Sequence, residues 1–148
     1  MILFVCTGNT CRSPMAAVLT AKMLSEAEIS CPVKSAGIHA SPDCAASAHA
    51  ITVMGEEGCD LLSHRSQKVT EALLAEATLI LAMTRGHRTA LCTTYPHAVE
   101  KIFTLNEYAE QGFDIDDPFG GDYTVYRNCA SQIKELLQIV VQKYKRDF

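Results

Sequence analysis

Short apolar runs alternate with stretches of helical periodicity along these 148 residues. The runs at 2–6, 33–36, 78–83 and 101–105 predict strands, because each is too short for a helix and apolar enough to be buried on both faces. Strands that alternate with helices favour parallel pairing, since a helical crossover is the usual connection between parallel strands. We therefore expect an α/β fold with a single domain over 1–148, built on a four-stranded parallel sheet flanked by helices on both faces.

Helices are expected at 14–25, 43–57, 86–92 and 123–145, where apolar residues recur at helical spacing. Ser13 is the expected N-cap of the first helix, and Pro14 suits its first helical position. The last helix carries its apolar residues on one face. They are Val125, Cys129, Ile133, Leu136, Leu137, Val140 and Tyr144.

Composition and charge narrow the function classes. Hydrophobic residues make up 48% of the chain and charged residues 20%, which is ordinary for a soluble domain. The net charge of -4 argues against nucleic-acid and membrane-surface binding, which usually need excess positive charge. No apolar run is long enough to cross a bilayer, and the N-terminal residues lack the pattern of a signal peptide. With seven cysteines, an odd number without dense spacing, we expect a cytoplasmic protein with free thiols, monomeric by default.

The segment CTGNTCRS at 6–13 leaves the first strand at the sheet edge where ligands of parallel sheets bind. Its small, turn-prone residues allow successive backbone N–H groups to converge on a tetrahedral anion, and the helix that follows adds its positive dipole end. Arg12 can hold two phosphate oxygens with its planar guanidinium. The expected phosphate-binding residues are Thr7, Gly8, Asn9, Thr10, Cys11 and Arg12.

Cys6 is the candidate nucleophile of this loop. The positive surroundings favour a thiolate, which is the reactive form of cysteine, and its attack on phosphorus would give a phosphocysteine intermediate. Ser13 could donate its hydroxyl to the sulfur as the sulfur leaves. The segment DDPFGG at 116–121 offers a general acid. On its own such a segment is typical of a solvated turn, and the loop at Cys6 makes it a candidate.

Other interpretations of the loop are open at this point. The C-x5-R spacing alone also fits a buried structural cysteine followed by a solvated arginine. Cys6 and Cys11 could ligate a metal, but no second Cys or His pair with finger spacing follows, and the nucleotide pattern G-x4-G-K-[ST] is absent. We therefore expect no metal and no cofactor. Cys11 could instead form a disulfide with an oxidised Cys6, or simply pack beneath the loop.

The chain resembles the low-molecular-weight protein tyrosine phosphatase family over nearly its whole length. The resemblance is carried by FVCTGNTCRSPMA from Phe4, SAG at 35–37, SHRSQ at 63–67, LILAMT at 79–84 and DDPFGG at 116–121. It implies the four-stranded parallel fold, Cys6 as nucleophile, Arg12 as phosphate ligand, and Asp117 as general acid and then base. It also implies that Asn9, Ser35 and His64 belong to a buried network that holds the loop in a strained shape.

Thr10 departs from the family pattern, which usually has a bulky aliphatic residue, most often Ile, at this position. A threonine hydroxyl offers an acceptor to guanidinium N–H groups, and the loop with DPFGG resembles the bacterial protein-arginine phosphatase branch. Asp117 could then also bind the guanidinium, and Phe119 could pack flat against it. The expected substrates are phosphorylated proteins that carry phosphoarginine. If Thr10 is a neutral substitution, the substrate is phosphotyrosine.

Two other function classes remain open. Thioredoxin-coupled arsenate reductases share this fold and a C-T-G-N-S-C-R-S loop, but they need two resolving cysteines after the third strand. Here Met83 stands near the first of those positions and Cys92 lies beyond it, while Pro14 replaces the usual Gln. A non-catalytic phosphate-binding module would not need nucleophile, arginine and acid together, and all three are present.

Overall fold

Four strands form one parallel sheet in the order β2-β1-β3-β4 in the computed structural model, which describes residues 1–148. The strands are β1 (Ile2–Cys6), β2 (Val33–Gly37), β3 (Leu79–Ala82) and β4 (Ile102–Thr104). All residues of β1 are buried because the strand pairs with β2 on one side and β3 on the other. The strand order reverses between β1 and β3, so the crevice at their carboxyl ends is where this fold class binds ligands.

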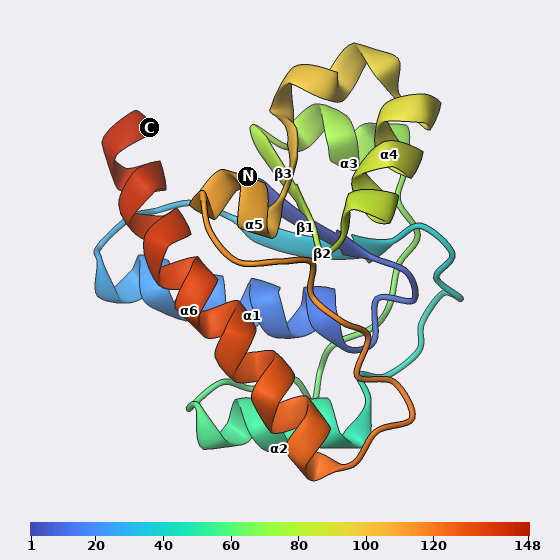
Figure 1. The fold of residues 1–148 in the computed structure, drawn as a ribbon, viewed down its shortest axis with the longest axis vertical. Helices are drawn as coiled ribbons and strands as arrows, with labels where there is room; N and C mark the ends of the chain where they lie inside the picture. Colours follow the sequence, from blue (N-terminus) through green and yellow to red (C-terminus); the bar gives the residue numbers. More distant parts are fainter.

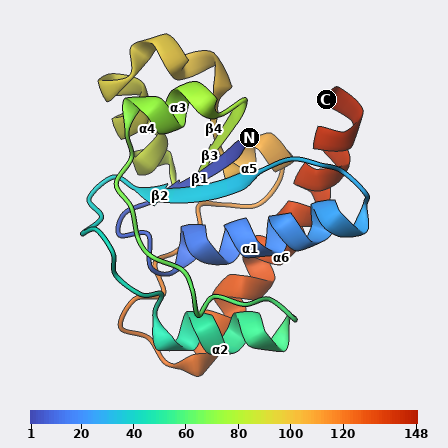
Figure 2. The same ribbon diagram turned by 180° about the vertical axis from the view of Figure 1, so that it is seen from behind.

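Helices cover both faces of the sheet (Figures 1 and 2). One face packs against α1 (Arg12–Glu26), α5 (Leu105–Ala109) and α6 (Tyr123–Asp147), and the other against α3 (Glu71–Glu76) and α4 (Arg85–Thr94). The strands alternate between two cores, because Ile2, Phe4 and Cys6 belong to one cluster and Leu3 and Val5 to the other. The predicted fold class, with helices on both faces, is confirmed.

Helix α1 begins earlier than predicted. Its first residue is Arg12, and the N-cap position is Cys11, which makes no side-chain capping bond. The prediction that Ser13 is the N-cap and Pro14 the first helical residue is therefore wrong. Pro14 is the third helical residue and is tolerated there, because the N–H groups of the first turn have no intrahelical partner. Ser13 is inside the helix, and its hydroxyl is directed to Cys6 instead.

Other elements also differ from those predicted. The stretch 43–57 was predicted to be helical, but α2 covers only Ala48–Glu56 because Asp43 has a φ of 60° and its N–H donates to Ser66. On α6 the side chain of Val125 is exposed, and Tyr126 is buried in its place. Three short elements were not predicted: α3, α5 and a 3-10 helix, η1 (Pro96–Lys101). No helix is both long enough and apolar enough to span a membrane.

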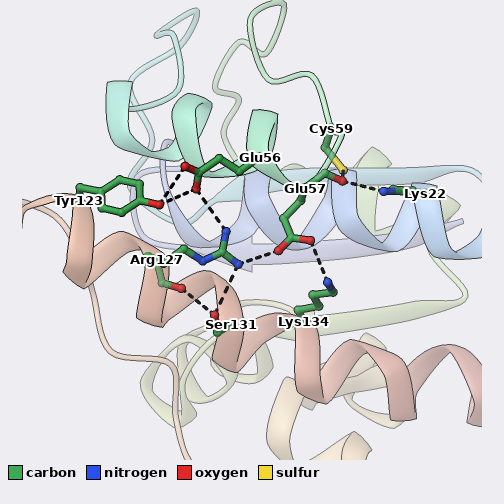
Figure 3. Close-up of polar contacts among 8 residues, drawn as sticks. All are labelled: Lys22, Glu56, Glu57, Cys59, Tyr123, Arg127, Ser131 and Lys134. Atoms are coloured by element: carbon green, nitrogen blue, oxygen red, sulfur yellow. Dashed lines mark hydrogen bonds and ion pairs between the residues drawn. The ribbon is translucent and has the colours of Figure 1, made fainter.

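A polar cluster joins the end of α2 to the start of α6 (Figure 3). Glu57 accepts hydrogen bonds from Arg127 at 2.6 Å and from Lys134 at 2.8 Å. Glu56 accepts one from the hydroxyl of Tyr123 at 2.7 Å. Because Tyr123 directly follows the acidic segment 116–122, this cluster ties the end of that segment to α2.

Candidate active site

The loop between β1 and α1 directs its carbonyl groups outward and leaves its N–H groups free. Carbonyl oxygens of the loop accept backbone hydrogen bonds from Ile38 to Cys6, from His39 to Thr7 and from Ser47 to Thr10, each at 2.9 Å. None of the N–H groups of residues 7–11 donates to a backbone acceptor. Free N–H groups on one short loop form a nest for an anion, and the N-terminus of α1 adds to its positive potential. The arrangement therefore suits a tetrahedral anion such as phosphate.

Asn9 holds this loop in its unusual conformation. It is fully buried and has a φ of 58°, in the left-handed region that non-glycine residues rarely adopt. Its amide donates to Ser13 Oγ and Ser35 Oγ, both at 2.9 Å, and its Oδ1 accepts the N–H of Gln67 at 3.0 Å. The ring of His64 lies 2.7 Å from its carbonyl oxygen. The structure thus brings Asn9, Ser13, Ser35 and His64 together as expected. Gln67 joins through its backbone, which carries no sequence signal.

Gly37, at the end of β2, is required by the close approach of the loop. A Cβ atom here would lie 2.6 Å from the carbonyl oxygen of Thr7 and 3.0 Å from the backbone nitrogen of Asn9. Any larger residue would push the loop away from the sheet. The glycine of the SAG motif therefore allows the loop backbone to pack close against the end of β2.

A cavity of about 230 Å³ opens in front of the loop. It is lined by Cys6, Thr7, Gly8, Thr10, Cys11, Arg12, Asp117 and Phe119. Cys6 is 3% exposed, and its Sγ lies 2.9 Å from Ser13 Oγ. Because Ser13 Oγ also accepts from Asn9, its own hydrogen is available to donate to the sulfur. A second cavity of similar volume is lined by Ser35 and His64, among others, and by no thiol.

Arg12 is buried at the start of α1. Its Nη1 donates to the carbonyl oxygen of Ile115 at 2.8 Å, and its Nη2 lies 3.7 Å from Asp117 Oδ2. A cation at a helix N-terminus is unfavourable because it faces the positive end of the helix dipole. Such a local conflict in a buried residue is typical of a functional site, since a bound anion would relieve it. The anchor at Ile115 was not predicted, as a carbonyl group has no sequence signature.

The acidic segment contributes one carboxylate to the cavity. Asp117 lines it with a half-exposed side chain, and its Oδ1 accepts the N–H of Phe119 at 3.1 Å. Asp116 does not line this cavity, so only the carboxylate of Asp117 borders the same cavity as Cys6 and Arg12. Phe119 is 75% exposed at the cavity mouth. Thr10 also lines this cavity.

Cys11 is held by two residues that sequence reasoning missed. Its Sγ lies 2.9 Å from Ser47 Oγ and 3.2 Å from the hydroxyl oxygen of Tyr126. Burial, together with the hydrogen bond to Cys11, raises the pKa of Tyr126 to about 12. The structure contains Cys6 and Cys11 as free thiols. Tyr126 lies on α6, so this contact connects the loop to the far end of the chain.

His87, at the start of α4, was also missed. One ring nitrogen, Nε2, lies 2.8 Å from Thr7 Oγ1, and the other, Nδ1, lies 3.0 Å from Thr84 Oγ1. Burial and the positive charge of Arg12 lower the pKa of His87 to about 4. The only available signal was the position of His87, just after a strand that ends at the ligand-binding edge of the sheet.

Comparison with known proteins places this geometry in a family. The model of the family described as low molecular weight phosphotyrosine protein phosphatase matches residues 1–148. The chain belongs to this family. Among curated relatives of this phosphatase family, a protein-arginine-phosphatase of Bacillus subtilis is 39% identical over 147 residues, covering 99% of this chain and 97% of the relative. A protein-arginine-phosphatase of Geobacillus stearothermophilus is 42% identical over 148 residues, covering 99% and 97%.

A solved member of the same phosphatase family superposes closely. The structure is described as the YwlE arginine phosphatase, in a mutant with a phosphorylated active-site serine. It has a TM-score of 0.95 and 38% identity, covering 99% of this chain and 96% of that one. The four-stranded parallel fold expected from the sequence is therefore the fold of this family.

Proposed function

We propose that this chain is a cysteine-dependent protein phosphatase that hydrolyses phosphoarginine side chains through a phosphocysteine intermediate. The observation that carries the proposal is one cavity lined by Cys6, Arg12, Asp117 and Thr10. The first three supply a nucleophile, a phosphate ligand and an acid, and Thr10 supplies a hydroxyl at the mouth. The names of the two protein-arginine-phosphatase relatives support the same substrate class.

In the first step the thiolate of Cys6 attacks phosphorus and forms the S–P bond. The N–P bond breaks, its electron pair stays on the guanidino nitrogen, and protonated Asp117 donates a proton to that nitrogen. The N–H groups of residues 7–11 and the guanidinium of Arg12 stabilise the charge on the phosphoryl oxygens as it shifts. The carbonyl of Ile115 fixes that guanidinium with a 2.8 Å hydrogen bond.

In the second step Asp117, now a carboxylate, takes a proton from water while the water oxygen attacks phosphorus. The S–P bond breaks and inorganic phosphate leaves. The electron pair returns to Cys6 as a thiolate, which the hydroxyl of Ser13 stabilises across 2.9 Å. The amide of Asn9 donates to the oxygen of Ser13 at 2.9 Å, and the carbonyl oxygen of Ala36 lies farther from this hydroxyl, at 3.5 Å, than the sulfur does, so the hydrogen of Ser13 can turn to a thiolate at Cys6. Asp117 is suited to both steps because its half-exposed side chain is open to water.

Thr10 and Phe119 are the proposed specificity residues. The hydroxyl of Thr10 accepts an N–H of the substrate guanidinium, and the exposed ring of Phe119 can lie against the guanidinium plane. The second candidate function is hydrolysis of phosphotyrosine, which is favoured by the family's own description. The polar mouth formed by Thr10 and Asp117 suits a guanidinium better than a phenyl ring.

The geometry gives no support to a thiol-coupled reductase. Met83 is fully buried in the core cluster that includes α1 and α6, on the same sheet face as Cys6. Cys92 packs against the cluster on the opposite face of the sheet. A resolving cysteine must reach the nucleophile. We therefore propose a phosphatase that acts on phosphorylated proteins in the cytoplasm, where the seven free thiols would stay reduced.

Steady-state kinetics with an arginine-phosphorylated protein and a matched phosphotyrosine peptide test the proposed function. The wild type is expected to prefer phosphoarginine in kcat/KM, and Thr10→Ile is expected to shift the preference toward phosphotyrosine by about 10-fold or more, because a site built to bind N–H groups rejects a partner that lacks them. Equal or better turnover of phosphotyrosine by the wild type would identify a tyrosine phosphatase. Thr52→Val, an exposed change on α2, is the control.

A further inference from the structure

His87 joins two chain segments at the ligand-binding edge of the sheet. It is the one buried histidine, 9% exposed, and both of its ring nitrogens have a partner. Thr84 caps α4 by accepting the backbone N–H of His87 at 3.2 Å, and the same hydroxyl meets Nδ1. The ring is therefore fixed to the segment that follows β3. The other ring nitrogen, Nε2, lies 2.8 Å from Thr7 Oγ1, in the loop that follows the neighbouring strand β1.

This contact holds the side chain of Thr7 in place. Thr7 is exposed and lines the active-site cavity, so its hydroxyl would otherwise be free to rotate away. Burial and Arg12 keep His87 neutral by lowering its pKa to about 4. If Nε2 carries the hydrogen, Thr7 Oγ1 accepts it and keeps one lone pair. If Nε2 is unprotonated, Thr7 donates to it and keeps both lone pairs. In either tautomer Thr7 can still accept a hydrogen bond.

A phosphorylated guanidinium keeps several N–H groups that need acceptors, and Asp117 and Thr10 are two of the acceptors in the cavity lining. Arginine carries several N–H donors in a rigid plane, and attachment of one phosphoryl group leaves most of them in place. Asp117 Oδ1 already accepts the N–H of Phe119, and Oδ2 faces Arg12. An N–H group left without a partner in a desolvated pocket costs free energy. The cavity lining has one further hydroxyl, that of Thr7.

We propose that the hydroxyl of Thr7 is a further acceptor for the guanidinium of phosphoarginine, and that His87 is the positioning residue that fixes this hydroxyl. The inference rests on the proposed function, because a phenyl ring offers no N–H group to accept. It gives His87 a role in substrate choice without direct contact with the substrate. It also explains why a polar threonine borders the catalytic cavity opposite a buried, neutral histidine.

The test compares kcat/KM for an arginine-phosphorylated protein with kcat/KM for para-nitrophenyl phosphate, an aryl ester without a guanidinium. Thr7→Val keeps the shape of the side chain and is expected to lower the ratio of the two values by about 10-fold, the effect of one lost hydrogen bond in a polar site. Thr7→Ser keeps the hydroxyl and should restore most of the ratio. Thr93→Val, an exposed change on α4, is the matched control and should leave the ratio at the wild-type value.

The role of His87 is read from a double-mutant cycle. His87→Leu should lower the ratio, and Thr7→Val combined with His87→Leu should lower it no further than Thr7→Val alone, because both changes act on one hydroxyl. His87→Gln keeps a hydrogen-bonding group and replaces His87→Leu in the cycle if His87→Leu does not fold. If the two single changes lower the ratio independently, so that their fold-losses multiply in the double variant, His87 does not act through Thr7 and its positioning role is overturned.

Other outcomes overturn the acceptor role of Thr7. A wild-type ratio in Thr7→Val would do so, and so would an equal loss on both substrates, which would indicate general damage to the loop. A wild type that hydrolyses the aryl ester but not phosphoarginine would overturn the proposed function itself. That failure is seen before any variant is made, so the two failures are distinct.

Discussion

Asn9 shows how far the active site depends on one residue. Its left-handed backbone and its side-chain hydrogen bonds hold the loop open for an anion. Asn9→Ala removes those bonds and adds the penalty of a left-handed alanine. We expect it to lower the free energy of unfolding by about 2–3 kcal/mol and kcat/KM by more than about 10-fold. Urea unfolding and steady-state kinetics measure the two effects.

Asn9→Gly separates the two causes, because glycine adopts the left-handed region without strain but cannot make the hydrogen bonds. It should be more stable than Asn9→Ala by about 1 kcal/mol and still be impaired in catalysis. If Asn9→Ala retained wild-type stability and turnover, the loop would be held by other contacts, and the network around Asn9 would be incidental.

Single residues could be predicted from the sequence where their partners are local. Cys6, Arg12 and Ser13 lie within the short segment 6–13, whereas Ser35 and His64, whose partners are distant, were predicted only from the family resemblance of the motifs at 35–37 and 63–67. The residues that were missed have distant partners. Thr7 and His87 are 80 positions apart, and Cys11 and Tyr126 are 115 apart. No periodicity or spacing encodes such a contact, which depends on how strands β1 and β3 and helix α6 pack.

At the scale of elements, the cluster between α2 and α6 is the contact to test, because it anchors the end of the segment that carries Asp117 (Figure 3). Hydrogen bonds from Lys134 and Arg127 lower the pKa of Glu57 below its ordinary value of 4.5. Ionised Glu57 therefore contributes its full stabilisation above pH 4.5, and this contribution is lost as the pH falls through the lowered pKa. We expect Glu57→Gln to lower the free energy of unfolding by about 1 kcal/mol at pH 7, discounted for partial solvent exposure.

Urea unfolding of the wild type and Glu57→Gln from pH 7 to pH 3 measures the difference in unfolding free energy and the direction in which it changes with pH. The difference between the two proteins should shrink as the pH falls below about 4, where the wild-type carboxyl also becomes protonated. Glu110→Gln is the control, because Glu110 is 79% exposed and 4.0 Å from Lys143. A difference that grew toward low pH, or that matched the control at pH 7, would contradict the assignment.

Elements were predictable where the pattern was long or strongly apolar. All four strands and the long helices α1 and α6 follow from their sequence patterns. The helices α3 and α5 have only six and five residues, too few to show a helical period. The stretch 43–47 has a helical pattern, but Asp43 and Cys44 pair with Ser66 and Ser47 donates to Thr10, and these tertiary hydrogen bonds override the local preference. What the sequence lacked was information about which segments lie side by side.

At the scale of the whole molecule, the positive charge of Arg12 lies at the positive end of the α1 dipole, and anion binding should relieve this repulsion. The chain carries a net charge of -4, so its overall field disfavours phosphate. The attraction must therefore come from the free N–H groups of residues 7–11 and from Arg12, which lies unfavourably at the positive end of α1. Inorganic phosphate, which binds the folded state alone, should raise Tm in proportion to the logarithm of its concentration.

The shift should be measured by thermal unfolding in phosphate against sodium chloride at equal ionic strength. At about 100 times the dissociation constant, phosphate should add about 2.7 kcal/mol, or about 5–10 °C in Tm for a chain of this size. Arg12→Ala should lose most of that shift whatever its own Tm, whereas Arg65→Ala, an exposed arginine outside the cavity lining, should keep it. An equal shift in wild type and Arg12→Ala would mean that phosphate stabilises the protein elsewhere. Loss of the shift in Arg12→Ala alone would show that Arg12, despite its unfavourable place at the positive end of α1, binds the anion.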